Sequence, residues 1–127
     1  MIKSLLLRRV LAAGFFLLIL VGSSIPSQNI PKMFTLTPDK LIHCAEYGVL
    51  AFFIALWATA EFSDARPVYR TILILGLGAS AGMLDELYQF LTPGRTPDFW
   101  DWCLDAVGVF IGTFSSQWMQ KKWPAVF

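Results

Sequence analysis

Four long apolar runs constrain this chain more than any other feature of its sequence. They lie at about residues 5–25, 41–60, 71–91 and 102–119. Each approaches the roughly 20 residues that a helix needs to cross the hydrocarbon core of a bilayer. Because a segment inside lipid must satisfy its own backbone hydrogen bonds, all four runs are predicted to be helices.

Composition supports lipid as the solvent of these helices. Hydrophobic residues make up 56% of the chain and charged residues only 15%, whereas a soluble domain carries about a quarter charged residues. A soluble fold of this size could not bury so much apolar surface. We therefore predict an all-α fold, a polytopic membrane protein with one domain over residues 1–127 and a four-transmembrane-helix bundle.

Positive charges predict how the bundle is oriented, because cytoplasmic segments are enriched in Lys and Arg. Seven of the ten such residues lie in the amino tail, the connection at 61–70 and the carboxyl tail. Both termini are therefore expected on the cytoplasmic side of the membrane. One alternative stays open, because the basic start, the first apolar run and small residues 22–24 also resemble a cleavable secretory signal. A retained helix is favoured, since cleavage would remove a packing partner from a small bundle.

Small residues predict where the helices meet, because helices in lipid associate by close backbone approach. The expected contact residues are Ala45, Gly48 and Ala51 in the second run, Gly76, Gly78, Ala79 and Gly82 in the third, with Gly78 and Gly82 at small-xxx-small spacing, and Gly108 and Gly112 in the fourth. Aromatic residues are expected in belts at the two membrane surfaces. The inner belt would contain Trp118 and Trp123, and the outer belt Phe99, Trp100 and Trp102.

Acidic residues gather at the opposite ends of the same runs, on the side predicted to face outward. In the second run Asp39, His43 and Glu46 stand at i, i+4 and i+7, which places them on one helical face. Glu46 lies more than a turn inside the apolar run. An ionisable group at that depth is costly unless it is paired, so it is a functional hypothesis by default.

The third and fourth runs add two further acidic stripes. Asp85 and Gln89 share a face one turn apart, and the turn that follows presents Arg95. Asp101 and Asp105 share a face of the last run. The candidate catalytic residues are His43, Asp85, Glu86, Asp39 and Glu46, and the candidate substrate-binding residues are Arg95, Gln89, Tyr47, Asp101, Asp105 and Lys40.

Two positions near this face also have structural interpretations. Asp98 stands at the entrance of the last run, where a carboxylate typically caps a helix. Cys44 and Cys103 are interpreted as small packing residues, and a disulfide between them stays open as a weaker alternative.

The stretches DKLIHCAEYGVLA and DELYQFLTPGRTPDFWDWCLDAVGVFIG resemble the VanZ-like family of small bacterial membrane proteins. The resemblance covers residues 39–112, and Asp105 stands where Asn is often found. Because the family is named for a protein linked to teicoplanin resistance, the resemblance implies a role in the cell envelope. The positions carried over by this match are Asp39, Lys40, His43, Tyr47, Asp85, Glu86, Gln89, Pro93, Gly94, Arg95, Asp101, Asp105, Gly108 and Gly112.

Several functions remain open at this stage, and the sequence leaves undecided whether the chain is an enzyme. The outer polar cluster could act on, or bind, a lipid-linked envelope precursor or a glycopeptide-related ligand. His43 would then serve as general base or acid, and Arg95 would hold a phosphate or carboxylate. No cofactor is implied, although the carboxylates could hold a divalent cation whose identity the sequence leaves unknown.

Two alternatives to this function are a purely structural or binding module and a proton- or cation-coupled transporter. Transport ranks last, because the acids cluster at one end of the runs instead of spanning their depth. The expected partners are membrane lipids. Nucleic-acid binding is not supported, since the formal net charge is only +1 and no basic stripe occurs.

Overall fold

The computed structural model describes residues 4–29 and 39–127, and within them it contains four long helices and no strand. The elements are α1 (Leu5–Ser23), a 3₁₀ turn η1 (Ser27–Asn29), α3 (Asp39–Glu61), α4 (Pro67–Gln89) and α5 (Phe99–Lys122). The prediction of an all-α bundle is confirmed.

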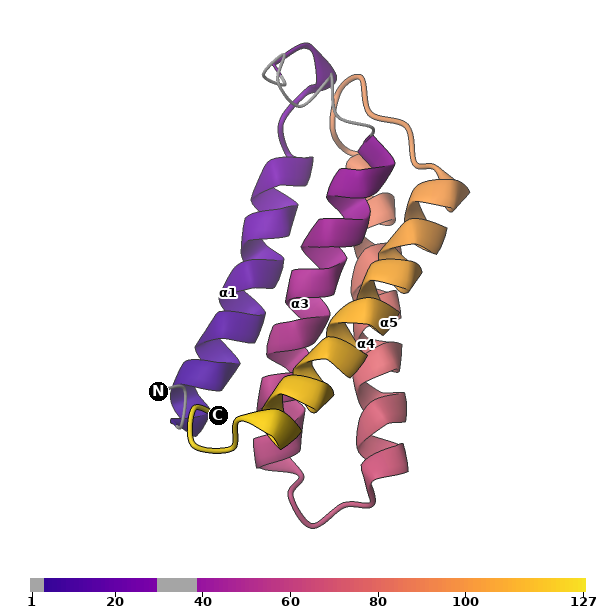
Figure 1. The fold of residues 1–127 in the computed structure, drawn as a ribbon. Helices are drawn as coiled ribbons and strands as arrows, with labels where there is room; N and C mark the ends of the chain where they lie inside the picture. Colours follow the sequence, from indigo (N-terminus) through magenta and orange to yellow (C-terminus); the bar gives the residue numbers. More distant parts are fainter. Residues whose placement is uncertain (1–3, 30–38) are drawn as a thin grey trace.

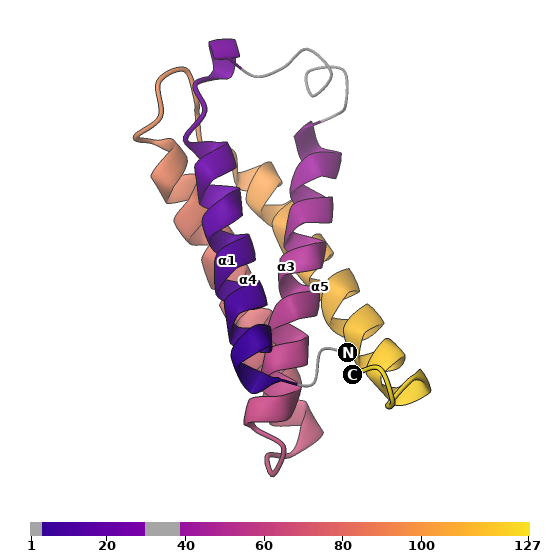
Figure 2. The same cartoon turned by 90° about the vertical axis from the view of Figure 1, so that its left-hand side faces the viewer.

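The four helices run side by side, and each is antiparallel to the next along the chain (Figure 1). The start of α1, the carboxyl end of the chain and the α3–α4 connection lie at one end of the bundle, here called the terminal end (Figures 1 and 2). At the opposite end, here called the polar end, α1 and α4 finish and α3 and α5 begin.

Three of the helices are long and apolar enough to cross a membrane, namely α1, the Leu41–Glu61 part of α3, and α4. This identifies the chain as a helical membrane protein. Helix α5 is not among the spans found in the described residues, although its 24 residues would extend about 36 Å. Its first turns carry Asp101 and Asp105, and its last turn carries Lys121 and Lys122, which lower its hydropathy.

The observed helix ends differ from the expected ones by a few residues. Helix α4 begins at Pro67, four residues before the predicted start. Proline is favoured at the first position of a helix, because the backbone N–H that it lacks would have no hydrogen-bond partner there. Helix α5 begins at Phe99 because Asp98 caps it: the Asp98 Oδ1 accepts a hydrogen bond from the Trp100 N–H at 2.8 Å. The capping prediction for Asp98 is confirmed.

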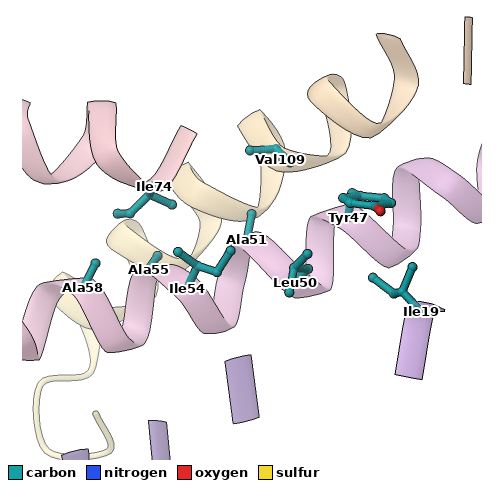
Figure 3. Packing of buried hydrophobic residues seen from close by; sticks show 9 residues of the cluster. All are labelled: Ile19, Tyr47, Leu50, Ala51, Ile54, Ala55, Ala58, Ile74 and Val109. Atoms are coloured by element: carbon teal, nitrogen blue, oxygen red, sulfur yellow. The ribbon is translucent and has the colours of Figure 1, made fainter. Parts of the chain in front are cut away.

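Helix α3 forms the centre of the bundle. Its buried face supplies Tyr47, Leu50, Ala51, Ile54, Ala55 and Ala58 to a cluster completed by Ile19 of α1, Ile74 of α4 and Val109 of α5 (Figure 3). Every other helix therefore packs against α3.

The closest helix contact joins α3 to α5 through glycines. A Cβ atom added to Gly108 would overlap the Cys44 carbonyl oxygen, and one added to Gly112 would overlap the Gly48 carbonyl oxygen. Only glycine permits this approach of the two backbones. The predicted contact at Gly108 and Gly112 is confirmed, whereas Ala45 is exposed and does not belong to it.

Helix α4 also meets α5 through glycines. A Cβ atom added to Gly78 would lie 2.6 Å from Val109 Cγ1, and one added to Gly82 would lie 3.0 Å from Asp105 Oδ2. The expectation for this pair is confirmed as well. Asp105 is thus enclosed by two glycine-mediated contacts, one on each side of α5.

Candidate functional site

The polar end contains a cluster of buried ionisable side chains that come from three helices. His43 of α3 is 7% exposed, Asp85 and Glu86 of α4 are 1% and 7% exposed, and Asp105 of α5 is fully buried. Four of the residues singled out from the sequence are therefore brought together, and we refer to these four as the polar cluster.

The glycine contacts explain why these side chains converge. Gly108 packs on the carbonyl group of Cys44, the residue after His43, so Asp105 lies one turn before that contact and faces α3. Gly82 packs on Asp105 itself, and Asp85 and Glu86 follow it by one turn of α4. The glycines thus determine both how closely the helices pack and which ionisable side chains lie next to one another.

His43 and Asp105 form a hydrogen-bonded pair. The His43 Nδ1 lies 3.0 Å from the Asp105 Oδ1, and both groups are buried. A carboxylate on one ring nitrogen fixes the orientation of an imidazole and supports the second nitrogen as a base or a ligand. This arrangement suits proton transfer or the binding of a cation.

Asp85 is surrounded by polar groups of α3 and α4. The Gln89 Nε2 donates a hydrogen bond to Asp85 Oδ2 at 3.4 Å. The fully buried Tyr47 lies within interaction range of the same carboxylate and donates its hydroxyl hydrogen to the Ala81 carbonyl at 3.3 Å. Tyr47 and Gln89 therefore belong to the wall of the polar cluster.

Glu86 connects the cluster to the start of α5. Its Oε2 accepts a hydrogen bond from the Asp98 backbone N–H at 2.9 Å. Asp98 is also the residue that caps α5, so one short segment both starts the helix and holds Glu86 in place.

One oxygen of each buried carboxylate has no hydrogen-bond partner among the residues that the structure describes. These atoms are Asp85 Oδ1, Glu86 Oε1 and Asp105 Oδ2. Buried polar atoms are nearly always paired, and leaving one unpaired costs about 1–3 kcal/mol, more for a charged group. Three such atoms in one cluster indicate a site that receives a proton, a cation or a ligand group.

Three members of the cluster have the chemistry and the spacing of metal ligands. One ligand atom each from His43, Glu86 and Asp105 can be chosen so that all lie within 4.8 Å of one another, and all three residues are buried. These are the residues best placed to hold a metal.

The other predicted site residues lie around the cluster. Glu46 and Asp101 are half-buried; Glu46 is within electrostatic range of His43, Asp85 and Asp105, and Asp101 is within range of His43. The side chains of Asp39 and Lys40 lie outside the described residues, although both residues belong to α3.

Arg95 does not enter the buried cluster. Arg95 belongs to the α4–α5 connection, and its side chain is half-exposed. Its Nε donates a hydrogen bond to the carbonyl of Ile25, which follows the end of α1, at 3.4 Å. It remains within electrostatic range of Glu46. Arg95 is thus a residue of the rim of the site.

Cys44 and Cys103 are both free thiols, so the weaker alternative of a disulfide between them is not formed. Trp102, assigned to the outer aromatic belt, is half-buried, and its indole N–H donates to the Ala79 carbonyl of α4 at 3.0 Å. Phe99 and Trp100 are exposed, as a belt requires.

Sequence analysis missed the anchor that joins α1 to the polar end. The buried hydroxyl of Thr92 donates to the Ser23 carbonyl at 2.9 Å, at the last residue of α1. A threonine in a short connection gives no sequence signal for such a contact, because its partner is a backbone atom 69 residues away.

An apolar groove runs along α1, α3 and α4 toward the cluster. Its volume is about 410 Å³, and hydrophobic side chains form most of its wall. Leu84, the residue before Asp85, lies at this wall together with Ala81, whose carbonyl binds Tyr47. Further lining residues are Ala12, Phe16, Leu50, Ile54 and Leu77.

Comparison with protein families identifies a relationship for most of the chain. The family model described as VanZ/LLP1 matches residues 10–120, which includes every member of the polar cluster. No curated protein and no solved structure matches the chain significantly.

Proposed function

Because the chain belongs to the VanZ/LLP1 family, we propose that it is a cell-envelope protein whose polar cluster binds and acts on a lipid-linked envelope ligand. The observation that carries the proposal is the convergence of His43, Asp85, Glu86 and Asp105 with three unpartnered carboxylate oxygens. Ionisable groups inside a membrane bundle are costly, so a cluster kept at this depth is best explained by what it binds.

The distribution of charge supports a bacterial cytoplasmic membrane with the polar cluster at its outer side. Arg9, Arg66, Arg70, Lys121 and Lys122 all lie toward the terminal end. By the positive-inside rule that end is cytoplasmic, with both termini. The cluster then lies at the depth of the outer leaflet.

The chemistry of the cluster suits a ligand with a polar head rich in donors. Carboxylate oxygens accept hydrogen bonds from hydroxyl, amide or ammonium groups, and the His43–Asp105 pair can take a proton from one of them. Arg95 at the rim provides a positive charge for a phosphate that joins such a head to its lipid.

The apolar groove supports the lipid part of the ligand. Its lining reaches from Leu84, the residue before Asp85, to Arg9 and Trp57 nearer the terminal end, and is formed by α1, α3 and α4. A chain attached to a head group in the cluster could occupy this groove without exposing polar atoms to lipid.

A structural role for the network is the second candidate, and specific contacts favour it. The Asp98 N–H on Glu86, the Ile25 carbonyl on Arg95 and the Ser23 carbonyl on Thr92 join the connections of the polar end. These contacts use only one Glu86 oxygen and leave the His43–Asp105 pair uninvolved, so they do not explain the whole cluster.

Co-purification of lipids from native membranes tests the proposal. Wild-type protein, His43→Ala, Asp85→Asn and the control Asp64→Asn would be extracted from the producing bacterium and their bound lipids identified by mass spectrometry. Asp64 is an exposed acid of the α3–α4 connection, so the control removes a carboxylate far from the cluster. A lipid-linked envelope precursor should be enriched on wild type and control and depleted at least tenfold on the other two variants. Equal lipid profiles on all four folded proteins would refute the function.

A further inference from the structure

We infer that His43, Glu86 and Asp105 form a binding site for one divalent transition-metal ion, with Asp85 as a neighbouring carboxylate that can complete the coordination. The role of the ion in binding a ligand rests on the proposed function. Metal binding itself rests on the arrangement of the side chains in the polar cluster.

Ligand spacing is the first argument. Two ligand atoms about 2.1 Å from a tetrahedral ion are about 3.4 Å apart. One ligand atom of each of the three residues falls within 4.8 Å of the others, which is close to that spacing. The hydrogen bond between His43 Nδ1 and Asp105 Oδ1 leaves the other ring nitrogen and the unpartnered Asp105 Oδ2 as the atoms to face an ion.

The unpartnered oxygens are the second and independent argument. Asp105 is fully buried and its Oδ2 has no partner in the described part of the chain; Glu86 Oε1 is in the same state. Asp85 Oδ1, from the most deeply buried acid of α4, is the third such atom. Each of these oxygens is a buried acceptor with free lone pairs, whereas an exposed carboxylate oxygen would be hydrogen-bonded to water.

The remaining oxygens of the same carboxylates are already held in position. Asp98 N–H binds Glu86 Oε2, and Gln89 Nε2 binds Asp85 Oδ2. In metal sites, outer hydrogen bonds of this kind orient the carboxylates toward the ion. The cluster therefore has ordered acceptors instead of mobile acidic side chains.

Charge balance favours a cation of charge +2. Within the described residues, neither Lys nor Arg forms an ion pair with Asp85, Glu86 or Asp105, and His43 is the one basic partner. In their ionised form these three carboxylates, with one imidazole, carry an excess of two or three negative charges among the described side chains. A divalent ion offsets most of this excess in a region where unpaired charge is expensive.

The donor set selects the class of metal. An imidazole nitrogen with carboxylate oxygens suits Zn²⁺ or Mn²⁺, whereas Mg²⁺ and Ca²⁺ prefer sites of oxygen alone. Three protein ligands leave a fourth coordination position, which either Asp85 or an oxygen of the bound ligand can take. Cys44 and Cys103 are not in this group of ligands.

Metal titration of the full-length protein in lipid nanodiscs tests the inference. After treatment with a chelator, the protein would receive Zn²⁺ or Mn²⁺ alone, be desalted, and be measured by elemental mass spectrometry and calorimetry. We expect about one ion per chain for wild type and for Asp64→Asn, and at least tenfold weaker binding for His43→Ala and Glu86→Gln.

A spectroscopic measurement keeps the inference testable even if a variant fails to fold. Co²⁺ added to the wild-type protein should give visible absorption bands of an ion with nitrogen and oxygen ligands, and Zn²⁺ should remove them. No retained ion and no bands on wild type, or equal retention by folded His43→Ala, would overturn the metal site. Lipid enrichment without a bound ion would overturn this inference alone, whereas a bound ion without lipid enrichment would overturn the proposed function alone.

Discussion

Asp105 shows how the bundle gives up stability at a single residue. It is fully buried, it binds His43 through one oxygen, and its other oxygen has no partner in the described residues. Such an arrangement is expensive in a low-dielectric interior, and replacing a whole buried ion pair with well-packed apolar groups is often neutral or stabilising. The residue is therefore expected to matter for binding more than for folding.

Replacing Asp105 with Asn separates these two roles. Asn has nearly the same shape and can keep a hydrogen bond to His43, but it removes the buried charge. Because His43 can release its proton once the carboxylate is gone, no unpaired buried charge needs to remain, and the free energy of unfolding should change by less than about 1.5 kcal/mol. Thermal unfolding in detergent measures this, and lipid enrichment, if the proposed function holds, should fall in the same variant. A large drop in melting temperature would instead support the structural role of the network.

Two neighbouring arginines at the terminal end give a second comparison of residues. Arg8 is buried, its Nη1 donates to the Leu56 carbonyl at 2.7 Å, and its Nη2 binds the Phe127 carbonyl. The side chain of Arg9 is 53% exposed and forms an ion pair with Glu61.

Arg8→Ala and Arg9→Ala should therefore differ in their effects on stability. The first leaves a buried carbonyl without its donor and should cost about 1–3 kcal/mol, whereas the second removes an exposed ion pair and should cost less than about 1 kcal/mol. Melting temperatures of the two variants, measured in the same detergent, check the order. An equal or larger loss for Arg9→Ala would contradict this account of the terminal end.

At the scale of helices, the α3–α5 contact determines the geometry of the polar cluster. Gly108 lies one turn after Asp105 and allows the two backbones to approach at Cys44. Any side chain at Gly108 should push the helices apart and move Asp105 away from His43. The bundle should then lose stability, and the polar cluster should lose its geometry, in the same variant.

Gly108→Ala tests this contact, with Gly76→Ala as its matched control. The added methyl group at position 108 would overlap the Cys44 carbonyl oxygen, whereas nothing lies within 4 Å of a Cβ atom at position 76. Overpacking of this kind costs about 1–3 kcal/mol, and an unhindered Gly→Ala change in a helix is neutral or stabilises by up to about 1 kcal/mol. Thermal unfolding of both variants provides the measurement. Equal melting temperatures would show that the contact is looser than described.

The same contact explains what could be predicted from the sequence. That His43, Asp85, Glu86 and Asp105 share one end follows from their positions in the apolar runs. Their pairing could not be predicted, because it depends on which face of α5 turns toward α3. Trp102 was assigned to a belt because indoles at helix ends are typical of one, yet a backbone carbonyl on α4 binds it. Ala45 has the right residue type for a contact but lies on the exposed face of α3.

At the scale of the whole molecule, the polar cluster and the charged terminal end are separated by an apolar centre. Leu50, Ile54, Ala58 and Ile74 fill the bundle between them (Figure 3). Within the described residues, the buried acids Asp85, Glu86 and Asp105 all belong to the polar end, so no chain of ionisable groups crosses the bundle. This arrangement disfavours a proton relay and favours a site reached from one side of the membrane.

The side from which the site is reached can be determined with reporter fusions. A fluorescent protein joined after Phe127 should fluoresce, because the terminal end is proposed to be cytoplasmic. Alkaline phosphatase, which needs an oxidising compartment to form its disulfides, should be active when fused after Arg95 in the α4–α5 connection. The same enzyme fused after Asp64 in the α3–α4 connection is the control and should be inactive. Activity at Asp64 together with inactivity at Arg95 would invert the bundle. The polar cluster would then face the cytoplasm, where a lipid-linked ligand of the outer leaflet could not reach it.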